Sequence, residues 1–532
     1  MAYEREYSSP KHRLLRLFKE GRENWKRKCQ EAKAALKRHQ DNLRATRTSR
    51  DLWKKRAKEN AMRLAAAEKE LAELRRAKTT TMSMLTAPGL LGGVSVAAMP
   101  TETVRHHHFC AMTIFLLVSY VLRSISLRAS VQVLRTNDMV FGTTTAVPSW
   151  WTVRLWVMRL GLYKLRRNKE KKGDRVWIVD HTVQIGEHKC LAIAGLRLAP
   201  FERSPRPIVY EDLEPLALVP MTHSNGEEVL KILRETEDKV GQPCQIVADH
   251  GSDVKSGIEE YCSDKPTVYT HDIKHLTAAT LKRELRSDKR WDAFCTKAAQ
   301  MRSEVQQTRK APLAPPKQRS KSRYMNCDEL TRWARRSLAI LKKRSPSFFD
   351  LVGVPEEQAK ACLSWMKQYR TDIHAWEEMT AIAETADSIV RHRGIYKGVG
   401  RLIRRRTRTP KHERARVFRR ALLAEVGQEE AKVPKKRVLV GSSEALESTF
   451  GKLKHIEGSQ ASGGFTGLLL AWAAILGQTS AQVVKKAMEA VKTSDVVAWT
   501  RNFLGKTVQG RRKAIAAALR PRMEGRKTGE FS

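Results

Sequence analysis

Two aspartates stand at positions where buried strands would bring carboxylates together. Asp180 continues the apolar run at residues 176–179, and a charge inside a buried strand is costly unless it is paired or bound to metal. Asp249 follows a second apolar run, residues 245–248, and the carboxyl ends of strands border clefts. Carboxylate oxygens are the ligands that hard divalent cations prefer. The sequence therefore predicts a divalent-metal site that contains Asp180 and Asp249.

A third carboxylate is expected from a late amphipathic helix. Leu446, Phe450 and Leu453 form its apolar stripe, while Glu444 and Glu447 lie on an adjoining face. We choose Glu447 as the third catalytic and metal-binding residue. Glu444 is kept as the alternative acid, because it falls in the first helical turn, where the helix dipole also explains a carboxylate.

Phosphoryl transfer is the chemistry that such a site supports. Two Mg²⁺ or Mn²⁺ ions about 3.5–4 Å apart can activate an attacking hydroxyl and stabilise the leaving oxygen of an in-line displacement. Lys452 and Lys454, farther along the same helix, are expected to contact phosphate. Asp272 and His275, which follow the last predicted strand, are expected to support the metal ligands without binding metal. A helix cap would explain Asp272 equally well.

The elements around these acids have the order of an α/β fold. Two β-branched runs joined at Gly186 predict a hairpin. The strands and helices expected after it cover residues 214–220, 225–240, 245–248, 253–261 and 267–269. The order β-β-β-α-β-α-β, followed by a helix, is that of an RNase H-like mixed sheet with helices on its faces. In such a sheet the strands that carry Asp180 and Asp249 are neighbours.

Composition indicates a polyanionic partner. The 532 residues include 100 Lys and Arg against 57 Asp and Glu, a net charge of +43, which argues against a metabolic enzyme and favours nucleic acid over an anionic membrane surface. The longest apolar run, residues 109–122, is shorter than the roughly 20 residues that a membrane span needs. The eight cysteines form no CxxC pair, so zinc has little support and a reducing cytoplasm fits.

The N-terminal part is expected to be a long helix. Residues 20–77 contain a heptad pattern with polar interruptions at Arg50 and Asn60, which predicts a self-associating coiled coil. The alternative is a solvated helix that packs on its own chain. Three adjacent histidines at positions 106–108 cannot all face one ion, so we expect them to have a local role.

A helix-turn-helix domain is expected before the sheet. Helices are predicted at residues 109–123 and 126–136, and a third would begin after Ser149 and end at Gly161. This third helix would enter the major groove of DNA; the alternative is a helical hairpin that only packs on the core. The residues expected to reach DNA are Trp151 and Thr152 at base edges, and Arg154 and Lys164 at phosphates.

A helical insertion is expected between Asp249 and Glu447, which stand 198 positions apart. A Pro-rich linker at residues 311–323 precedes helical patterns, and the strongly basic run at residues 401–420 is interpreted as a phosphate-tracking surface or a solvated helix face. Trp365 and Trp376 are expected in the core, with base stacking as the alternative.

The predicted division is a helical coiled-coil region (1–77), a linker (78–104), the helix-turn-helix domain (105–170), the first part of the catalytic core (171–310), the basic insertion (311–435), the last part of the core (436–485) and a basic C-terminal region (486–532).

Several blocks of the sequence resemble a known family. DHTVQIG, VADHGSDVKSG, THDIKHLTAATLKREL and SSEALESTFGKLK are similar to the blocks of bacterial insertion-sequence transposases of the DDE type. The resemblance covers residues 109–285 and 440–477 and implies that Asp180, Asp249 and Glu447 are the catalytic triad. In the related group with a Tyr-Arg-Glu-Lys signature, the glutamate and lysine have the spacing of Glu447 and Lys454, whereas Val440 and Ser443 replace the Tyr and Arg.

The function that this resemblance implies is that of a transposase. It would bind element ends and carry out metal-dependent strand cleavage and strand transfer, with double-stranded DNA of the element ends and the target as partner. We expect a homodimer or higher oligomer on DNA, no membrane partner, and a cytoplasmic place at the bacterial nucleoid. The alternatives are a structure-selective nuclease or resolvase with an RNase H-like fold, and a non-catalytic DNA-binding regulatory protein.

Overall fold

A computed structural model describes two compact units, Met1–Ala97 and Ala98–Ser532. In the first unit, only helical residues between Gly21 and Gln30 are described, so most of the predicted coiled coil and most of the predicted linker lie outside the described residues. The described residues are 21–23, 25–26, 29–30, 103–105, 107–141, 146–185, 188–318, 324, 327–342, 346–458, 466–504 and 508–519.

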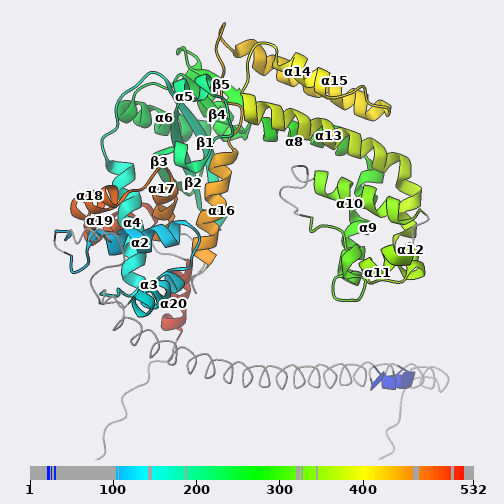
Figure 1. Cartoon of the computed structure of the whole chain (residues 1–532), viewed down its shortest axis with the longest axis horizontal. Coiled ribbons are helices and arrows are strands. Elements are labelled where there is room, and N and C mark those ends of the chain that lie inside the picture. The colour runs from blue at the N-terminus through cyan, green and yellow to red at the C-terminus, as the bar shows by residue number, and fades with distance from the viewer. Residues whose placement is uncertain are drawn as a thin grey trace, which may run out of the picture. The chain divides into compact units, whose positions relative to one another are not determined.

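The second unit is built around a mixed five-stranded sheet in the order β3-β2-β1-β4-β5 (Figure 1). The strands are β1 (Arg175–Ile185), β2 (His188–Arg197), β3 (Glu214–Met221), β4 (Gln245–Ala248) and β5 (Val268–His271). The first three strands pair antiparallel, whereas β4 runs parallel to β1 and β5 parallel to β4. The chain therefore has the mixed α/β architecture that the sequence predicts.

The two faces of the sheet carry different helices. Trp177 and Val179 of β1 pack into one core with residues of α6 (Gly226–Val240) and α7 (Ser252–Cys262). Val176 and Ile178 belong to the core on the other face, which also contains the apolar residues of α16 (Glu444–Gly458). Because side chains alternate along a strand, Asp180 projects toward the face that α16 covers.

Three helices precede the sheet: α2 (Ala111–Leu122), α3 (Leu127–Phe141) and α4 (Trp150–Arg166). Ser149 caps α4 as predicted, since its side chain accepts a hydrogen bond from the amide of Thr152. The prediction that Gly161 ends this helix is wrong, because α4 continues to Arg166. A Cβ atom at Gly161 would lie 1.9 Å from the carbonyl oxygen of Leu470. The glycine therefore serves a close helix approach and not a helix end.

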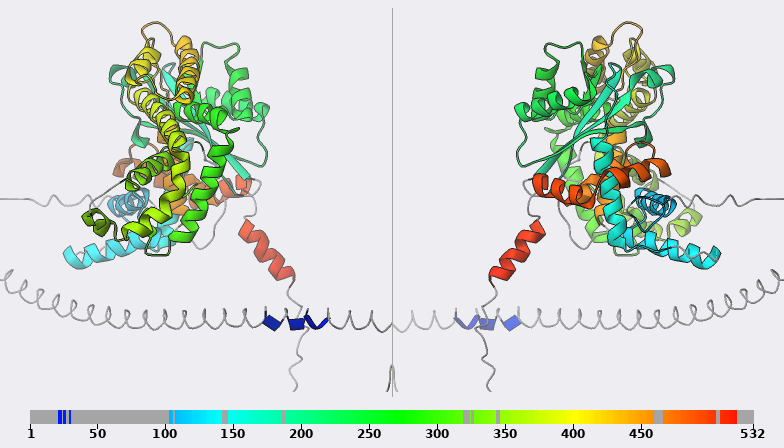
Figure 2. Two further views of the ribbon diagram at one scale, coloured as in Figure 1. Left: turned by 90° about the vertical axis from the view of Figure 1, so that its right-hand side faces the viewer. Right: turned by 90° about the vertical axis from the view of Figure 1, so that its left-hand side faces the viewer.

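The C-terminal segments pack around α4. In Figure 2, the cyan helices before the sheet lie beside the orange-red helices of this region. The elements are η4 (Gly467–Leu470), α17 (Ala471–Ile475), α18 (Ala481–Ala490) and α19 (Thr493–Leu504), and α20 (Val508–Ala518) follows them. Between β2 and β3 lie α5 (Leu198–Arg203) and η1 (Tyr210–Asp212). In the part of the chain that is described, no helix is both long and apolar enough to cross a membrane.

Helices occupy the stretch between β5 and α16. They are α8 (Ile273–Leu285), α9 (Lys289–Val305), η2 (Ala311–Leu313), α10 (Cys327–Ile340), α11 (Pro346–Val352), α12 (Glu356–Leu363), η3 (Ser364–Tyr369), α13 (Arg370–Arg393), α14 (Val399–Arg406) and α15 (Glu413–Lys432). Trp376 is 1% exposed and packs with Trp291, Phe294 and Tyr369, and Trp365 joins the same aromatic cluster through Phe294. Trp376 is therefore a core residue, as expected, and the partly buried Trp365 packs against the same core.

Candidate metal centre

The parallel part of the sheet ends in a row of aspartates. The last paired residues of β1 and β4, and of β4 and β5, stand side by side in register, and each is directly followed by an aspartate. These are Asp180, Asp249 and Asp272. Residues at the same level of parallel neighbours project to the same face, so the three carboxylates face the side of the sheet that α16 covers.

Helix α16 supplies the glutamate of the centre. Its apolar stripe is buried as predicted, with Leu446 and Leu453 at most 1% exposed, and Trp472 donates a hydrogen bond to the buried hydroxyl of Thr449 at 3.0 Å. With this stripe docked on the core, Glu447 is half-buried and close enough to act electrostatically on Asp180. The helix thus brings the third predicted acid to the two aspartates.

The pKa of Asp180 is raised, because the residue is buried beside other carboxylates. Exclusion of water raises the pKa of Asp180 to about 8, and the negative charges of Asp249 and Glu447 add to that rise. His275 and the amide of His181, which donates to Asp180 Oδ1 at 2.7 Å, act in the opposite direction. A divalent cation would relieve this repulsion, so the charges of the described residues fit such an ion.

Glu447 has an oxygen without a partner. Its Oε1 atom is buried and has no hydrogen-bond partner among the described residues. The nearest cation is His275, whose Nδ1 lies 3.8 Å from that oxygen. Burial raises the pKa of Glu447, and His275 opposes the rise. A buried carboxylate oxygen without a hydrogen-bond donor is costly. A metal ion bound to the Oε1 atom of Glu447 would remove this cost, because the oxygen has lone pairs that no donor occupies among the described residues.

Asp272 joins the end of β5 to the starts of two helices. Its Oδ1 accepts hydrogen bonds from the amide of His275 at 2.8 Å and from the Nδ1 of that residue at 3.0 Å. Its Oδ2 accepts from the amide of Ser443 at 2.6 Å and from the Ser443 hydroxyl at 3.0 Å. The carboxylate is fully buried. It therefore caps α8 and also anchors the start of α16, so the helix-cap alternative holds.

His275 is held between carboxylates. Burial lowers its pKa, but the Asp272 and Glu447 carboxylates outweigh that effect and raise the pKa to about 9. In the described residues, the ligand atoms of Asp272, His275 and Glu447 lie within 4.8 Å of one another, and this compact set does not include Asp180 or Asp249. Both oxygens of Asp272 are already occupied by donors. We therefore interpret Asp272 and His275 as supports of the site and Asp180, Asp249 and Glu447 as its candidate ligands.

The alternative acid Glu444 is engaged elsewhere. Its Oε2 lies 2.6 Å from the Nε of Arg391, which stands in the last turn of α13. An acid that already has an ion-pair partner is a poorer candidate ligand than one with a free buried oxygen. The contrast favours Glu447 over Glu444.

The two lysines of α16 differ in their surroundings. Lys452 is half-buried, and its Nζ lies 3.3 Å from the centroid of the Tyr210 ring. Lys454 is exposed. A cation over an aromatic face is already stabilised, so Lys454 is the better placed of the two to meet a phosphate.

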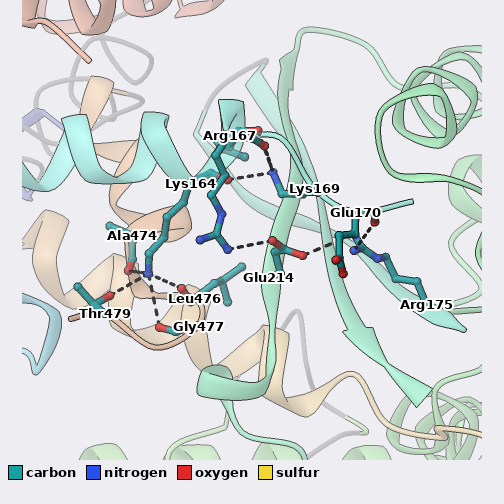
Figure 3. Close-up of polar contacts among 11 residues, drawn as sticks. Lys164, Arg167, Lys169, Glu170, Arg175, Glu214, Ala474, Leu476, Gly477 and Thr479 are labelled. Atoms are coloured by element: carbon teal, nitrogen blue, oxygen red, sulfur yellow. Dashed lines mark hydrogen bonds and ion pairs between the residues drawn. The ribbon is translucent and has the colours of Figure 1, made fainter. Parts of the chain in front are cut away.

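Lys164 does not face solvent, which corrects the prediction that it contacts phosphate. Figure 3 shows its ammonium group among oxygens of the C-terminal segment. The Nζ atom donates to the carbonyl oxygens of Ala474 at 2.9 Å and Leu476 at 2.5 Å, and to the Thr479 hydroxyl at 2.9 Å. The side chain is 2% exposed. The lysine at the end of α4 is therefore a structural residue.

Arg154 is also withdrawn from solvent. It is 8% exposed, and its guanidinium group lies 4.8 Å from the centroid of Trp151, which is itself 51% exposed. Most of α4 is buried, and its exposed residues are Trp150 and Trp151 in the first turn and Arg166 at its end. A helix that packs on the core therefore describes α4 better than an exposed recognition helix. The prediction that Arg154 contacts phosphate is wrong, because its side chain is buried.

Other residues near the centre escaped the sequence analysis. His250 and His271 stack with ring centroids 3.5 Å apart. Glu429 of α15 accepts a hydrogen bond from the amide of His271 at 3.0 Å. A histidine adjoins each of the three aspartates in the sequence, but the register sets His271 opposite Ala248, so the stacking of its ring on His250 could not be predicted from register alone. The residues around Glu429 in the sequence do not indicate its hydrogen bond with His271.

His107, one of the three adjacent histidines, lies away from this centre. Its Nε2 atom lies 2.9 Å from the Nη1 atom of Arg159, which agrees with a local role.

Comparisons with known proteins are sparse. No family model and no curated protein matches the chain. Among solved structures, it is similar to a chain described as "Drosophila P element transposase strand transfer complex", with a TM-score of 0.33 and 12% sequence identity. The alignment covers 80% of this chain and 100% of that chain.

Proposed function

We propose that this protein is a DNA transposase of the DDE type, in which an RNase H-like core cleaves DNA strands and joins them to a target. One observation carries the proposal. Asp180 within β1 and Asp249 after β4 each follow the last residue that pairs these two parallel strands, and α16 adds Glu447 with a buried carboxylate oxygen that has no hydrogen-bond partner among the described residues. Three acids on one face of the sheet, with the cation His275 beside them, suit a divalent-metal centre.

The sheet supports the RNase H-like part of this proposal. Apart from the short α5 and η1 between β2 and β3, its strands and helices follow the expected chain order β-β-β-α-β-α-β, and β1, which contains Asp180, is the neighbour of β4, which Asp249 follows. The helices between α8 and α16 agree with an insertion that separates the third acid from the first two. This arrangement explains why carboxylates so distant in sequence can serve one centre.

Asp180, Asp249 and Glu447 would hold two Mg²⁺ or Mn²⁺ ions. When bound, such ions activate an attacking hydroxyl and stabilise the leaving oxygen of an in-line displacement at phosphorus. The protein's own part is to position these ligands: Asp272 holds both His275 and the start of α16. The positive charge on His275, beside Glu447, would also favour a phosphate oxygen at the site.

Double-stranded DNA is the substrate that the charge supports. The net charge of +43 would draw the protein to phosphates through counterion release. We infer that the protein binds the ends of its element, cleaves there, and joins the new 3′-hydroxyl to target DNA. Assembly as a homodimer or higher oligomer on DNA belongs to the same proposal.

The test is a strand-cleavage and strand-transfer assay with the full chain. The substrate is labelled DNA from the flanks of the gene, with Mg²⁺ or Mn²⁺ present. We expect Asp180→Ala, Asp249→Ala and Glu447→Ala to abolish both products, and the matched control Glu444→Ala to retain them. Cleavage in all three variants would refute the triad. Cleavage without joined product by the wild type would favour the nuclease alternative.

A further inference from the structure

A stripe of arginines runs along α14. Arg401, Arg404, Arg405 and Arg408 follow one another at spacings of three, one and three residues, and all four are exposed. On a helix, residues three and four apart lie on the same face, so Arg401, Arg404 and Arg405 share one face of α14, and Arg408 follows the C-cap Thr407 just beyond the helix end. We call these four exposed arginines the α14 stripe.

The α14 stripe lacks countercharges within the described residues. None of its four guanidinium groups forms an ion pair or side-chain hydrogen bond there. Other arginines between β5 and α16 are paired, for example Arg283 with Glu425, Arg290 with Asp372, Arg332 with Glu384 and Arg335 with Glu377. Like charges at helical spacing repel one another, so the stripe costs stability in the free protein. An anionic partner would remove that cost.

The α14 stripe is held on a braced helix pair. Figure 1 shows α14 beside α15. The Glu430 carboxylate of α15 accepts hydrogen bonds from the amides of Gly398 at 2.7 Å and Gly400 at 2.9 Å. Arg419 donates to the Thr407 hydroxyl at 3.0 Å at the other end of α14. Because Glu430 already occupies the amides at the start of α14, attraction for a further anion must come from the arginine side chains.

A hollow adjoins the α14 stripe. It has a volume of about 490 Å³ and lies between α14 and α15, lined by Lys397, Gly400, Arg401, Arg404, Leu423, Gly427, Glu430 and Ala431. The Glu430 carboxylate in this lining is the one that accepts from the Gly398 and Gly400 amides. The glycines bring the backbone close to the surface. Arginine forks match the geometry of phosphate oxygens, so the hollow can take a phosphate group that the two arginines flank.

The helix pair is fastened to the sheet beside the metal centre. Glu429 of α15 accepts from the amide of His271 at 3.0 Å, and Lys432 donates to the carbonyl oxygen of Tyr269 at 3.0 Å. His271 directly precedes Asp272 in the sequence. A polyanion held by the α14 stripe would thus be held by an element that is anchored at the edge of the candidate centre.

We propose that the α14 stripe and its hollow bind the phosphate backbone of duplex DNA, independently of base sequence. The inference rests on the proposed function in that this DNA is the substrate of the metal centre. A membrane surface is the weaker partner, because the apolar residues Val399 and Ile403 of α14 are fully buried, and membrane-surface helices insert exposed apolar residues.

The test measures DNA binding apart from cleavage. The full chain is titrated against a labelled duplex of unrelated sequence in EDTA, by fluorescence anisotropy, between about 50 and 200 mM salt. The variant carries Arg401→Gln, Arg404→Gln, Arg405→Gln and Arg408→Gln. The matched control removes four ion-paired arginines by Arg283→Gln, Arg290→Gln, Arg332→Gln and Arg335→Gln. Thermal melts establish that both are folded.

We expect the stripe variant to bind more weakly at every salt concentration, with a log–log salt slope shallower by about one unit per arginine lost. The control variant should keep nearly the wild-type slope. Equal slopes in wild type and stripe variant, or an equal loss in the control, would overturn the inference. It would also be overturned if the stripe variant lost binding to phosphatidylserine-containing vesicles but bound DNA as the wild type does.

The outcome separates this inference from the proposed function. Asp180→Asn should bind the duplex with the wild-type slope and yet not cleave DNA. If the wild type cleaves no DNA but the stripe variant still loses affinity, the α14 stripe stands and the proposed function fails. If Asp180 is needed for cleavage but the stripe variant binds as the wild type does, the proposed function stands and the stripe inference fails.

Discussion

Asp272 accepts hydrogen bonds from both the amide and the hydroxyl of Ser443, at 2.6 and 3.0 Å. Ser443 directly precedes α16, whereas Asp272 directly follows β5. One buried carboxylate therefore fixes where the glutamate-bearing helix begins relative to the sheet edge that carries the aspartates. The position of Glu447 depends on a residue that need not touch metal or substrate.

Asp272→Asn is expected to weaken both the fold and the centre. An amide side chain has one oxygen, so at least one of the two pairs of donors loses its acceptor. Because hydrogen bonds to a buried charged group contribute about 1.5–3 kcal/mol each, we expect the free energy of unfolding to fall by about 2–4 kcal/mol. Cleavage should fall as well, since Glu447 is no longer held. Chemical denaturation and the cleavage assay measure the two effects.

Asn225→Ala is the control for that substitution. Asn225 caps α6 through a hydrogen bond from the amide of Glu228 at 2.8 Å, on the face of the sheet away from α16. Its loss should cost about 1 kcal/mol and leave cleavage per folded molecule unchanged. If Asp272→Asn cleaves at the wild-type rate, Asp272 does not position the centre.

Glu447→Gln is expected to reduce DNA cleavage strongly, whereas Glu444→Gln is expected to affect mainly stability, and only slightly. The first removes the charge of the carboxylate with the free buried oxygen, and we expect a loss of cleavage of about a hundredfold or more, as for other groups that stabilise transition-state charge. The second breaks an ion pair with Arg391 in which both side chains are about one-third exposed. Such a pair contributes about 1 kcal/mol or less. Single-turnover cleavage distinguishes them, and a reversed ranking would assign the ligand to Glu444.

The stability of the metal-free protein should fall as pH rises. The pKa of Asp180 is about 8 in the folded state against 3.8 for the ordinary group, so the folded state keeps a proton that the unfolded state has lost across that window. Each pH unit in the window then removes up to about 1.4 kcal/mol of stability. The contribution of the protonated Asp180 carboxyl group to stability is complete below pH 3.8 and is lost above about pH 8.

Asp180→Asn should remove that pH dependence. The isosteric amide does not ionise, so the difference in melting temperature between pH 5 and pH 9 in EDTA should be smaller in the variant. Addition of Mg²⁺ at the higher pH should raise the melting temperature of the wild type and leave the variant unchanged. A wild type whose melting temperature does not respond to Mg²⁺ would contradict a metal centre at Asp180.

Much of the sheet could be predicted because its signals are local. β4 was predicted with the bounds that it has, and β3 and α6 nearly so, since runs of apolar residues and helical spacing are written into short windows. An acid within the apolar strand β1 was informative for the same reason. Asp180 stands out because a buried strand rarely tolerates an unpaired charge.

The contacts that failed to be predicted are those between distant segments. In the sequence, Lys164 is a basic residue near the end of a helix, which predicted a phosphate contact. Only the fold shows that oxygens of residues 474–479 surround its ammonium group. Gly161 has the residue type of a helix end, yet its role depends on the approach of Leu470. The link between Asp272 and Ser443 is likewise absent from any local pattern.

Lys164→Met is expected to destabilise the protein without a direct effect on DNA binding. The change leaves the carbonyl oxygens of Ala474 and Leu476 without their donor, and unsatisfied buried groups cost about 1–3 kcal/mol each. We therefore expect a lower melting temperature but the wild-type DNA affinity per folded molecule. The control is Arg166→Gln, an exposed position on the same helix. Loss of DNA affinity at an unchanged melting temperature would restore Lys164 as a phosphate contact.

Gly161→Ala and Gly451→Ala should have opposite effects on stability, although both glycines lie inside helices. A Cβ atom at Gly161 would meet the backbone oxygen of Leu470 at 1.9 Å, whereas nothing lies within 4 Å of a Cβ atom at Gly451. Overpacking of this kind costs about 1–3 kcal/mol, and relief of a glycine in an exposed helix interior gains about 1 kcal/mol. Thermal denaturation of the two variants measures the difference. A tolerated alanine at Gly161 would mean that α4 and the segment around Leu470 are not packed as closely as described.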